Sequence, residues 1–296
     1  MPVLKLAILS RDSKLYSTKR LVEEARKQQH KVRVLDPLRC YLSVAPQALS
    51  LKYKGKSLSS FDAVIPRIGS SITYYGVTLV RQFELMKVVS LNSAAGISLA
   101  RDKLACLQTL SAGLVNFPKT GFAQSPDDTH DLLELCGNSP VVIKLNDGSQ
   151  GRGVVLAEND NTAEALIAAF RSQWVYLLVQ KYISEANGKD IRCFVIGDQV
   201  VAAMERSAKP GDFRSNLHQG GSGTLVELDE TERDVAIRAA KLMGLDVAGV
   251  DLIRSAHGCM VLEVNASPGL EGIEKVCGIN IAGLIISHLE NKVKSN

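Results

Sequence analysis

The chain has 296 residues and a mass of 32.0 kDa, with 46% hydrophobic and 22% charged residues, which is typical of a folded globular protein. This length favours about two domains. No apolar stretch reaches the ~18 residues of a membrane-spanning helix, and the net charge of +4 is too small to predict nucleic-acid binding. Six widely spaced cysteines without a Cys-x-x-Cys pair indicate buried reduced thiols and a reducing cytosol. A lysine at position 5 interrupts the first apolar stretch, so no signal peptide is predicted.

The first ninety residues alternate between strand and helix patterns. The predicted strands cover residues 3–10, 31–35, 62–66 and 88–92, and the predicted helices cover 15–29 and 78–89. The lysine-containing stretch 52–56 is predicted to be a loop. This alternation indicates a parallel sheet with helices on both faces. Because no Gly-x-Gly-x-x-Gly follows the first strand, a Rossmann dehydrogenase is disfavoured.

A second pattern begins near residue 97. Its predicted helices cover 100–112, 125–135 and 162–172, and its strands cover 118–123, 140–145, 154–158 and 176–182. The remainder has strands at 190–196, 199–205, 248–253 and 260–264, a helix opened by a capping box at Asp229 and Glu232, and a helix from about residue 281. We therefore expect three parts: 1–96, 97–182 and 183–296.

Three oxygen-bearing side chains lie on the last predicted hairpin. If its turn lies at residues 256–257, Asp251 faces Leu262 or Glu263, and Glu263 and Asn265 share one face of their strand. Both acids interrupt apolar strands, where an unpaired charge is costly. An all-oxygen set suits Mg²⁺ or Mn²⁺ completed by water and phosphate. The alternative interpretation is a solvated hairpin face.

Residues 147–153 contain three glycines between two apolar strands. Glycines let the backbone fold over a ligand, and its N–H groups bind phosphate oxygens, although an ordinary hairpin turn has the same composition. Lys144 precedes this turn, and Lys103 lies near the start of a helix, so each is either a phosphate ligand or a solvated charge. The polar loop around Arg214 offers a guanidinium group and amides suited to phosphate and carboxylate, or is a solvated loop.

In this order, the motifs resemble those of the ATP-grasp superfamily and its RimK family. The resemblance rests on Lys144, the turn 148–153, the strand end 179–182, Asp190-Ile-Arg192, and Asp251 with Glu263-Val-Asn265, while the segments 214–221 and 263–272 match the RimK branch. It covers essentially the whole chain. It implies an α/β (α+β) ATP-grasp fold, in which an N-terminal parallel-sheet α/β domain precedes two lobes that clasp ATP.

The resemblance also implies roles for individual residues. The metal ligands for two Mg²⁺ ions, or for Mn²⁺, are then Asp251, Glu263 and Asn265. The catalytic residues are Arg214 and Asn216. The residues that bind ATP are Lys103, Lys144, Gly148, Ser149, Gly151, Gly153, Lys181, Tyr182, Asp190, Arg214, Ser215 and Asn216.

The implied activity is that of an ATP-dependent acid–amino-acid ligase. An acceptor carboxylate takes the γ-phosphate of ATP, and the amine of L-glutamate then displaces phosphate from the acyl phosphate. The implied acceptor is the C-terminus of a ribosomal protein, and the implied enzyme is a cytoplasmic homo-oligomer, such as a tetramer, that contacts neither nucleic acid nor membrane. Two alternatives are the same chemistry on a carrier protein, cofactor or dipeptide, and an ATP-binding regulatory module without catalysis.

Overall fold

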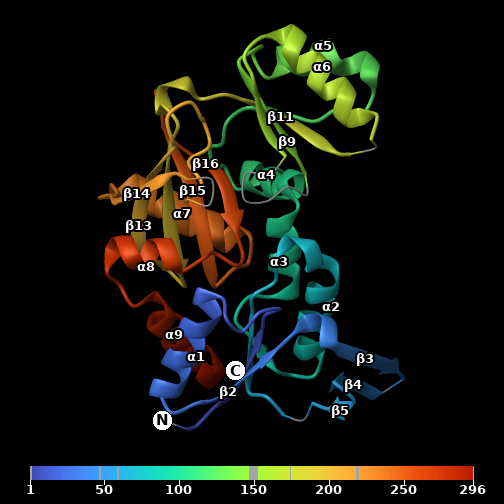
Figure 1. The fold of residues 1–296 in the computed structure, drawn as a ribbon, viewed down its shortest axis with the longest axis vertical. Helices are drawn as coiled ribbons and strands as arrows, with labels where there is room; N and C mark the ends of the chain where they lie inside the picture. The colour runs from blue at the N-terminus through green and yellow to red at the C-terminus, as the bar shows by residue number, and fades with distance from the viewer. Residues whose placement is uncertain are drawn as a thin grey trace.

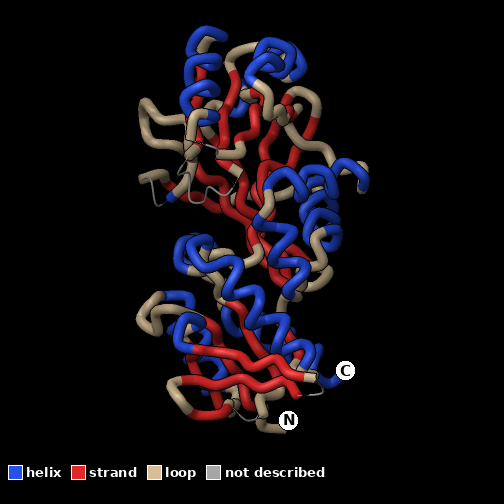
Figure 2. The backbone as a smooth tube through the Cα atoms, turned by 90° about the vertical axis from the view of Figure 1, so that its right-hand side faces the viewer, coloured by secondary structure: helices blue, strands red, loops and turns tan. Residues whose placement is uncertain are grey.

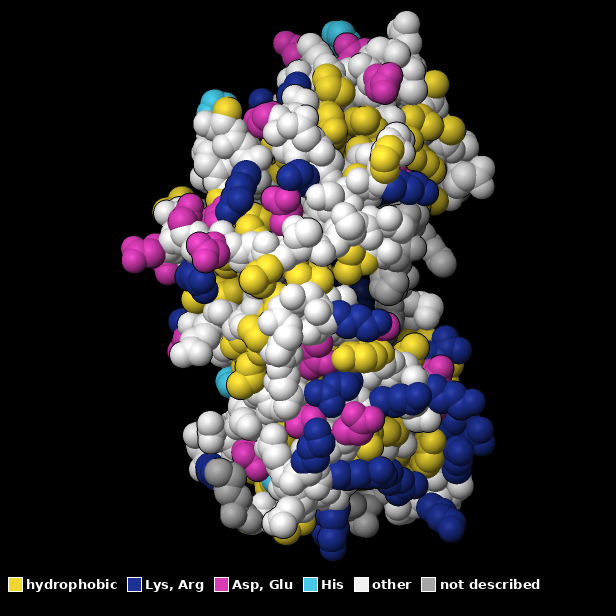
Figure 3. All heavy atoms as spheres, turned by 60° about the vertical axis from the view of Figure 1, so that its left-hand side comes forward, with side chains coloured by type: hydrophobic (Ala, Val, Ile, Leu, Met, Phe, Trp, Pro, Cys, Tyr) yellow, Lys and Arg dark blue, Asp and Glu magenta, His cyan; other side chains and the backbone are white. Residues whose placement is uncertain are grey.

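The computed structural model describes residues 2–46, 48–58, 60–146, 153–173, 175–217 and 220–295. Its main sheets follow one another along the longest axis (Figure 1). The N-terminal sheet lies at the lower end, and the other two large sheets lie in the upper half, as the side view in Figure 2 also shows. Lysine and arginine side chains gather on the lower half of the face in Figure 3, so the positive charge of this face lies mainly at its N-terminal end.

A parallel sheet forms the N-terminal end, in the order β2-β1-β6-β7. Its strands are β1 (Lys5–Leu9), β2 (Lys31–Leu35), β6 (Ala63–Pro66) and β7 (Val89–Ser90). Leu6 and Ile8 of β1 pack with α1 (Tyr16–Lys27) and α9 (Ile281–Ser295), whereas Ala7 and Leu9 pack with α2 (Thr73–Leu85) and α3 (Ala94–Arg101). The predicted parallel sheet with two covered faces is therefore confirmed.

The lysine-containing stretch is not a loop, so this prediction was wrong. It forms part of a small antiparallel sheet of β3 (Cys40–Ala45), β4 (Ala48–Tyr53) and β5 (Lys56–Ser57). Leu51 of β4 is buried opposite Leu42, while Lys52 next to it is exposed. Since only one face of this sheet is covered, apolar and charged residues alternate, and the lysines hide the strand pattern.

The central sheet has the order β10-β9-β11-β8 and is antiparallel. Its strands are β8 (Thr120–Gly121), β9 (Val141–Leu145), β10 (Val154–Ala157) and β11 (Leu177–Lys181). Ile143 and Val179 point to one face, where they pack with α5 (Thr129–Leu135) and α6 (Asp160–Arg171). Because strand residues alternate, Lys144 and Gln180 belong to the opposite face, away from α5 and α6.

The expected helix at 100–112 is divided at Asp102 into the end of α3 and α4 (Lys103–Ala112). The Asp102 side chain caps α4 by accepting a hydrogen bond from the Ala105 amide (3.0 Å). Asn146, at the end of β9, binds this first turn: its Oδ1 accepts from the Leu104 amide (3.2 Å), and its carbonyl accepts from Lys103 Nζ (2.9 Å). The start of α4 is thereby fixed beside the end of β9.

A five-stranded antiparallel sheet forms the C-terminal part, in the order β14-β13-β12-β15-β16. Its strands are β12 (Lys189–Ile196), β13 (Gln199–Ser207), β14 (Ser222–Leu225), β15 (Val247–Ser255) and β16 (Gly258–Asn265). The helix α7 (Glu230–Leu242) packs on one face and begins with the predicted capping box of Asp229 and Glu232. The helix α8 (Glu271–Cys277) packs near β13 and β14 and was not predicted.

The N-terminal sheet is joined to the C-terminal sheet by a buried asparagine. Asn92 Nδ2 donates to the carbonyls of Val247 (2.7 Å) and Ala266 (2.9 Å), and its Oδ1 accepts from the Val247 amide (2.9 Å). Arg20 of α1 also pairs with Glu274 of α8 (3.1 Å). These contacts fix the start of β15 and the end of β16 relative to the N-terminal sheet.

Within the described ranges, no single helix is both long and apolar enough to cross a membrane. The helices α8 and α9 reach the required length and composition only as a pair, and 109° separates their directions.

Gly96→Ala tests how closely α3 approaches α7. A Cβ atom at Gly96 would lie 2.7 Å from the carbonyl oxygens of Met243 and Gly244. We expect this substitution to lower the free energy of unfolding by about 1–3 kcal/mol, because overpacking against backbone outweighs the better helix propensity of alanine. Gly69→Ala is the control, since a Cβ there meets nothing within 4 Å. Equal stability of both variants in urea denaturation would contradict the packing argument.

Candidate active site between the central and C-terminal sheets

A cavity of about 140 Å³ lies between the Lys144 face of the central sheet and the C-terminal sheet. It is lined by most of the predicted site residues: Lys103, Lys144, Lys181, Tyr182, Asp190, Arg214, Ser215, Asn216, Asp251 and Glu263. Gly148, Ser149 and Gly151 lie outside the described residues. Gly153 begins the turn into β10 with a φ of +71°, and its carbonyl accepts from the Leu145 amide (2.8 Å).

Lys144 reaches the cavity from β9 and is held by a glutamine. Its Nζ donates to Gln180 Oε1 (2.6 Å), and Gln180 Nε2 in turn donates to Thr120 Oγ1 (2.7 Å). Burial is the main cause that lowers the pKa of Lys144 to about 8; within this net value, the charge of Glu263 opposes the shift and that of Lys103 adds to it. Two lysine ammonium groups thus line one small cavity, which suits a polyanion.

Two aspartates and two arginines form a buried network on the cavity face of the C-terminal sheet. Arg206 of β13 donates to both carboxylate oxygens of Asp190 (2.7 and 2.6 Å) and pairs with Asp251 (2.8 Å). Arg192 of β12 also donates to both oxygens of Asp251, with a distance of 2.7 Å from Nη2 to Oδ2. Burial opposes ionisation of Asp251, but the two arginines outweigh it and lower the pKa of this carboxyl group.

Glu263 reaches the cavity because of a β-bulge. An unbulged hairpin with its turn at residues 256–257 pairs Asp251 with Leu262, whereas the structure pairs Asp251 with Glu263 after a register shift between Asp251 and Leu252. Val261 and Val264 both remain buried on the α7 side of this sheet. The additional residue therefore presents Glu263 next to Asp251, as one of the two predicted registers requires.

The candidate metal ligands fit a cation that keeps part of its coordination shell. No hydrogen bond or ion pair joins Glu263 to another residue of the described chain. Asn265 uses its amide nitrogen on the Gly249 carbonyl (3.4 Å), and it lines the neighbouring cavity. In the described ranges, no three His, Cys, Asp or Glu side chains gather as a metal cluster. The two carboxylates and one amide therefore suit Mg²⁺ that takes its other ligands from water and phosphate.

Arg214 lies in the loop that follows β13 and is oriented by Asp212. Its Nε and Nη2 donate to the two carboxylate oxygens (3.0 Å each), and these hydrogen bonds lower the pKa of Asp212 to about 2. Ser215 is buried beside it. The loop folds tightly here, because a Cβ at Gly221 would lie 2.7 Å from the Ser215 carbonyl oxygen and 2.8 Å from that of Ser207. Arg214 is thus held at the cavity wall.

The strand end at 181–182 contributes mainly backbone and an aromatic ring. The Lys181 side chain donates to the carbonyls of Gly137 (3.0 Å) and Asn138 (3.3 Å), near the end of α5. The Tyr182 ring meets Phe213 edge-on, with a centroid distance of 6.3 Å. This wall is therefore more apolar than the lysine wall, as suits a flat ring system.

Gln180 and Arg206, which line the cavity, and the nearby Arg192 were not predicted as partners of the site residues. Gln180 positions Lys144, and Arg192 and Arg206 hold Asp251. Arg206 is paired with Asp190 only because a second bulge, between Phe194 and Val195, shifts the β12–β13 register by one residue. The opposite charges of Asp190 and Arg206 on adjacent strands were the available sequence signal for this ion pair. Without the bulge, however, Asp190 would be expected opposite Glu205, so the signal could not be recognised.

Comparisons with known proteins agree with this architecture. The RimK PreATP-grasp domain model matches residues 4–97, and the RimK-like ATP-grasp domain model matches residues 100–289. A "Probable alpha-L-glutamate ligase" of Alkalilimnicola ehrlichii is 56% identical, over 98% of this chain and 97% of the relative.

Two solved structures share the fold. ATP-grasp ligase PsnB, complexed with minimal precursor, Mg and ADP, has a TM-score of 0.74 at 21% identity, over 98% of each chain. D-cycloserine synthetase DcsG has a TM-score of 0.75 at 19% identity, over 98% of this chain and 99% of the other. The two family models together cover the chain almost from end to end. The chain belongs to the RimK family of ATP-grasp proteins.

Proposed function

We propose that this protein is an ATP-dependent ligase that joins L-glutamate to the C-terminal carboxylate of a protein. It is an ATP-grasp ligase by family, and its 56% identical relative is named as an alpha-L-glutamate ligase. The observation that carries the proposal is the cavity in which Lys103 and Lys144 from one side meet Asp251 and Glu263 from the other. Cationic side chains for phosphate and oxygen ligands for a cation are what phosphoryl transfer to a carboxylate requires.

The first step brings one anion to another. The acceptor carboxylate attacks the γ-phosphorus of ATP, the bond to the bridging oxygen breaks, and ADP leaves. Two unit charges of like sign at 4 Å repel by about 4 kcal/mol at an effective dielectric of 20. Lys103, Lys144 and Arg214 reduce this repulsion and stabilise the charge on the transferring group. When bound, Mg²⁺ adds further charge neutralisation at the phosphates.

The second step forms the amide bond. The amine of L-glutamate attacks the acyl carbon, phosphate leaves, and the amine loses a proton. Arg214 and Asn216 are the residues that we assign to the leaving phosphate, since both line the cavity beside the lysines. Ser215, Asp190, Lys181 and Tyr182 belong to our proposed nucleotide site, together with the glycines at 148, 151 and 153 and with Ser149.

The metal site and the biological setting are also parts of the proposal. Asp251, Glu263 and Asn265 are our ligands for Mg²⁺, with Mn²⁺ as the other candidate. Asp251 joins this set through an oxygen that it shares with Arg192 or Arg206. The proposed acceptor is the C-terminus of a ribosomal protein, and the proposed enzyme is a cytoplasmic homo-oligomer.

The proposed activity is tested by incubating the protein with ATP, Mg²⁺, L-glutamate and ribosomal proteins. We expect ADP release that depends on L-glutamate and a mass increase of one or more glutamyl residues on one acceptor, located at its C-terminus by mass spectrometry. ADP release that is indifferent to L-glutamate, with no modified acceptor, would contradict the proposed function.

Glu263→Gln tests the cation site without leaving a buried arginine unpaired. We expect ADP release to fall on the order of 10²-fold, with a higher Mg²⁺ requirement, because one anionic ligand is lost while the side-chain shape is kept. Glu158→Gln, at an exposed position after β10, is the matched control and should leave turnover unchanged. Unaltered turnover and Mg²⁺ dependence in Glu263→Gln would remove Glu263 from the proposed site.

The pKa of Lys144 predicts a pH dependence of nucleotide binding. Below pH 8 its ammonium group is already charged, whereas above pH 8 binding a phosphate must also recover a proton. We expect the affinity for the ATP analogue AMPPNP to fall about tenfold between pH 7 and pH 9. Lys144→Arg stays protonated over this range, so its affinity should change little. An equal fall in both proteins, measured by calorimetry, would show that another group titrates.

A further inference from the structure

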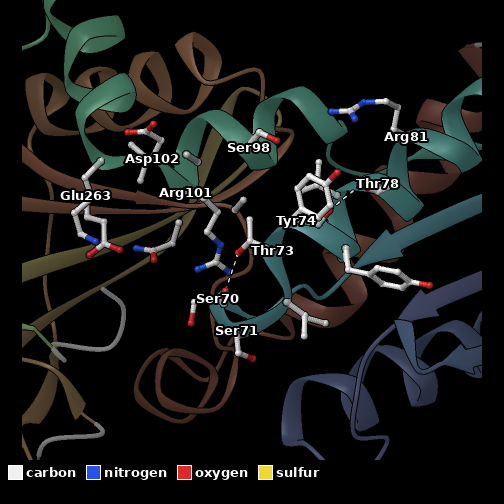
Figure 4. A pocket seen from close by; sticks show the side chains of 18 of the residues that line it. Ser70, Ser71, Thr73, Tyr74, Thr78, Arg81, Ser98, Arg101, Asp102 and Glu263 are labelled. Carbon is white, nitrogen blue, oxygen red and sulfur yellow. Dashed lines mark hydrogen bonds between the residues drawn. The ribbon is translucent and has the colours of Figure 1, made fainter. Parts of the chain in front are cut away.

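A larger cavity of about 710 Å³ lies beside the first one. Its walls are η2 (Ser70–Ile72) with the first turns of α2, the junction of α3 and α4, and the end of β16 (Figure 4). Lys103 and Glu263 line both cavities. The reacting atoms therefore belong near these two residues, where the cavities meet. The larger cavity is within the volume range of small-molecule binding sites, so substrates other than ATP can approach through it.

Arg101 lies in the wall of the larger cavity next to Glu263. In Figure 4 its guanidinium group lies between Glu263 on one side and Ser70 and Thr73 on the other. One nitrogen, Nη2, donates to the Ile68 carbonyl (2.5 Å), while Nε is buried and has no hydrogen-bond partner in the described chain. A buried donor without a partner is costly and indicates a position for a ligand acceptor.

A second arginine lies close to Arg101. Arg67 donates to the Pro268 carbonyl (2.7 Å), and burial together with the charge of Arg101 lowers its pKa to about 10. No carboxylate of the described residues lies within 4 Å of either guanidinium group. Two neighbouring cations without an ionic partner favour binding of an anion, and a guanidinium fork matches a carboxylate.

The amino acid that supplies the amine has two carboxylates, and these lie at different distances from the reacting amine. The α-carboxylate is bonded to the carbon that carries the amine, so it stays near the boundary of the two cavities, where Lys103 lies. The carbon of the side-chain carboxylate of glutamate lies three bonds from that α-carbon, against one bond for the carbon of the α-carboxylate. Arg101 lines the larger cavity and not the nucleotide cavity, so its position suits the more distant group.

We propose that Arg101 binds the side-chain carboxylate of the incoming amino acid, and thereby selects glutamate over its neutral amide, glutamine. This inference rests on the proposed function. It makes Arg101 a specificity-determining residue. The rest of the cavity, toward Arg81 and the 86% exposed Tyr74, is left for the end of the acceptor chain.

Calorimetric titration of L-glutamate and L-glutamine into the protein, saturated with AMPPNP and Mg²⁺, tests this inference without an acceptor. We expect the wild-type protein to bind glutamate at least tenfold more tightly than glutamine. Arg101→Gln keeps an amide donor for the Ile68 carbonyl but loses the charge, so it should bind glutamate at least tenfold more weakly and bind glutamine as before. Arg81→Gln, at an exposed arginine of the same cavity, is the control and should keep the wild-type preference.

The outcomes separate this inference from the proposed function. An unchanged preference for glutamate in Arg101→Gln would overturn the role of Arg101 while leaving the ligase activity in place. An equal loss of affinity for glutamate and glutamine, with AMPPNP binding intact, would also overturn it, since Arg101 would then hold the shared α-carboxylate or the wall itself. A wild-type protein that binds AMPPNP but neither amino acid would contradict the proposed substrate.

Discussion

The pairing of two aspartates with two arginines on the cavity face of the C-terminal sheet is the constraint on which the site depends. Asp190, Arg206, Asp251 and Arg192 come from three adjacent strands, and Asp251 accepts hydrogen bonds from both arginines. Buried charges are tolerated only when paired, and removing one partner costs about 3–5 kcal/mol. The network therefore fixes the strands against one another, and with them the bulge that presents Glu263.

Charge balance explains how one site can accept several anions. The network of two aspartates and two arginines is neutral as a whole, so it does not cancel the positive charge of Lys103 and Lys144 at the cavity, and Arg214 adds a guanidinium group that Asp212 orients. On the other side of Glu263, Arg101 supplies a second positive region at the wall of the larger cavity, with Arg67 buried near it. The reaction requires ATP, an acceptor carboxylate and an acidic amino acid to meet, and two separate cationic regions on either side of Glu263 allow this.

The sequence predicted the covered parallel sheet, the capping box of α7 and the hairpin with three oxygen-bearing residues, because these follow from local periodicity and turn residues. The gathering of the nucleotide-site residues in one cavity was expected only from the family resemblance. Two features were beyond prediction. Bulges shift the Asp190–Arg206 and Asp251–Glu263 pairs by one residue. The position of Arg101, next to Glu263 but without an ion pair in the described residues, depends on contacts between distant segments. The strands β3 to β5 were missed because their exposed lysines resemble a loop.

The central claim is that an acceptor carboxylate is phosphorylated between the two sheets before the amide bond forms. The most direct measurement uses an acceptor peptide with an ¹⁸O-labelled C-terminal carboxylate and follows the released phosphate by ³¹P NMR. The account predicts one ¹⁸O atom in each phosphate, because the carboxylate oxygen that attacks ATP leaves with the phosphoryl group. Unlabelled phosphate, released together with an amide product, would contradict it.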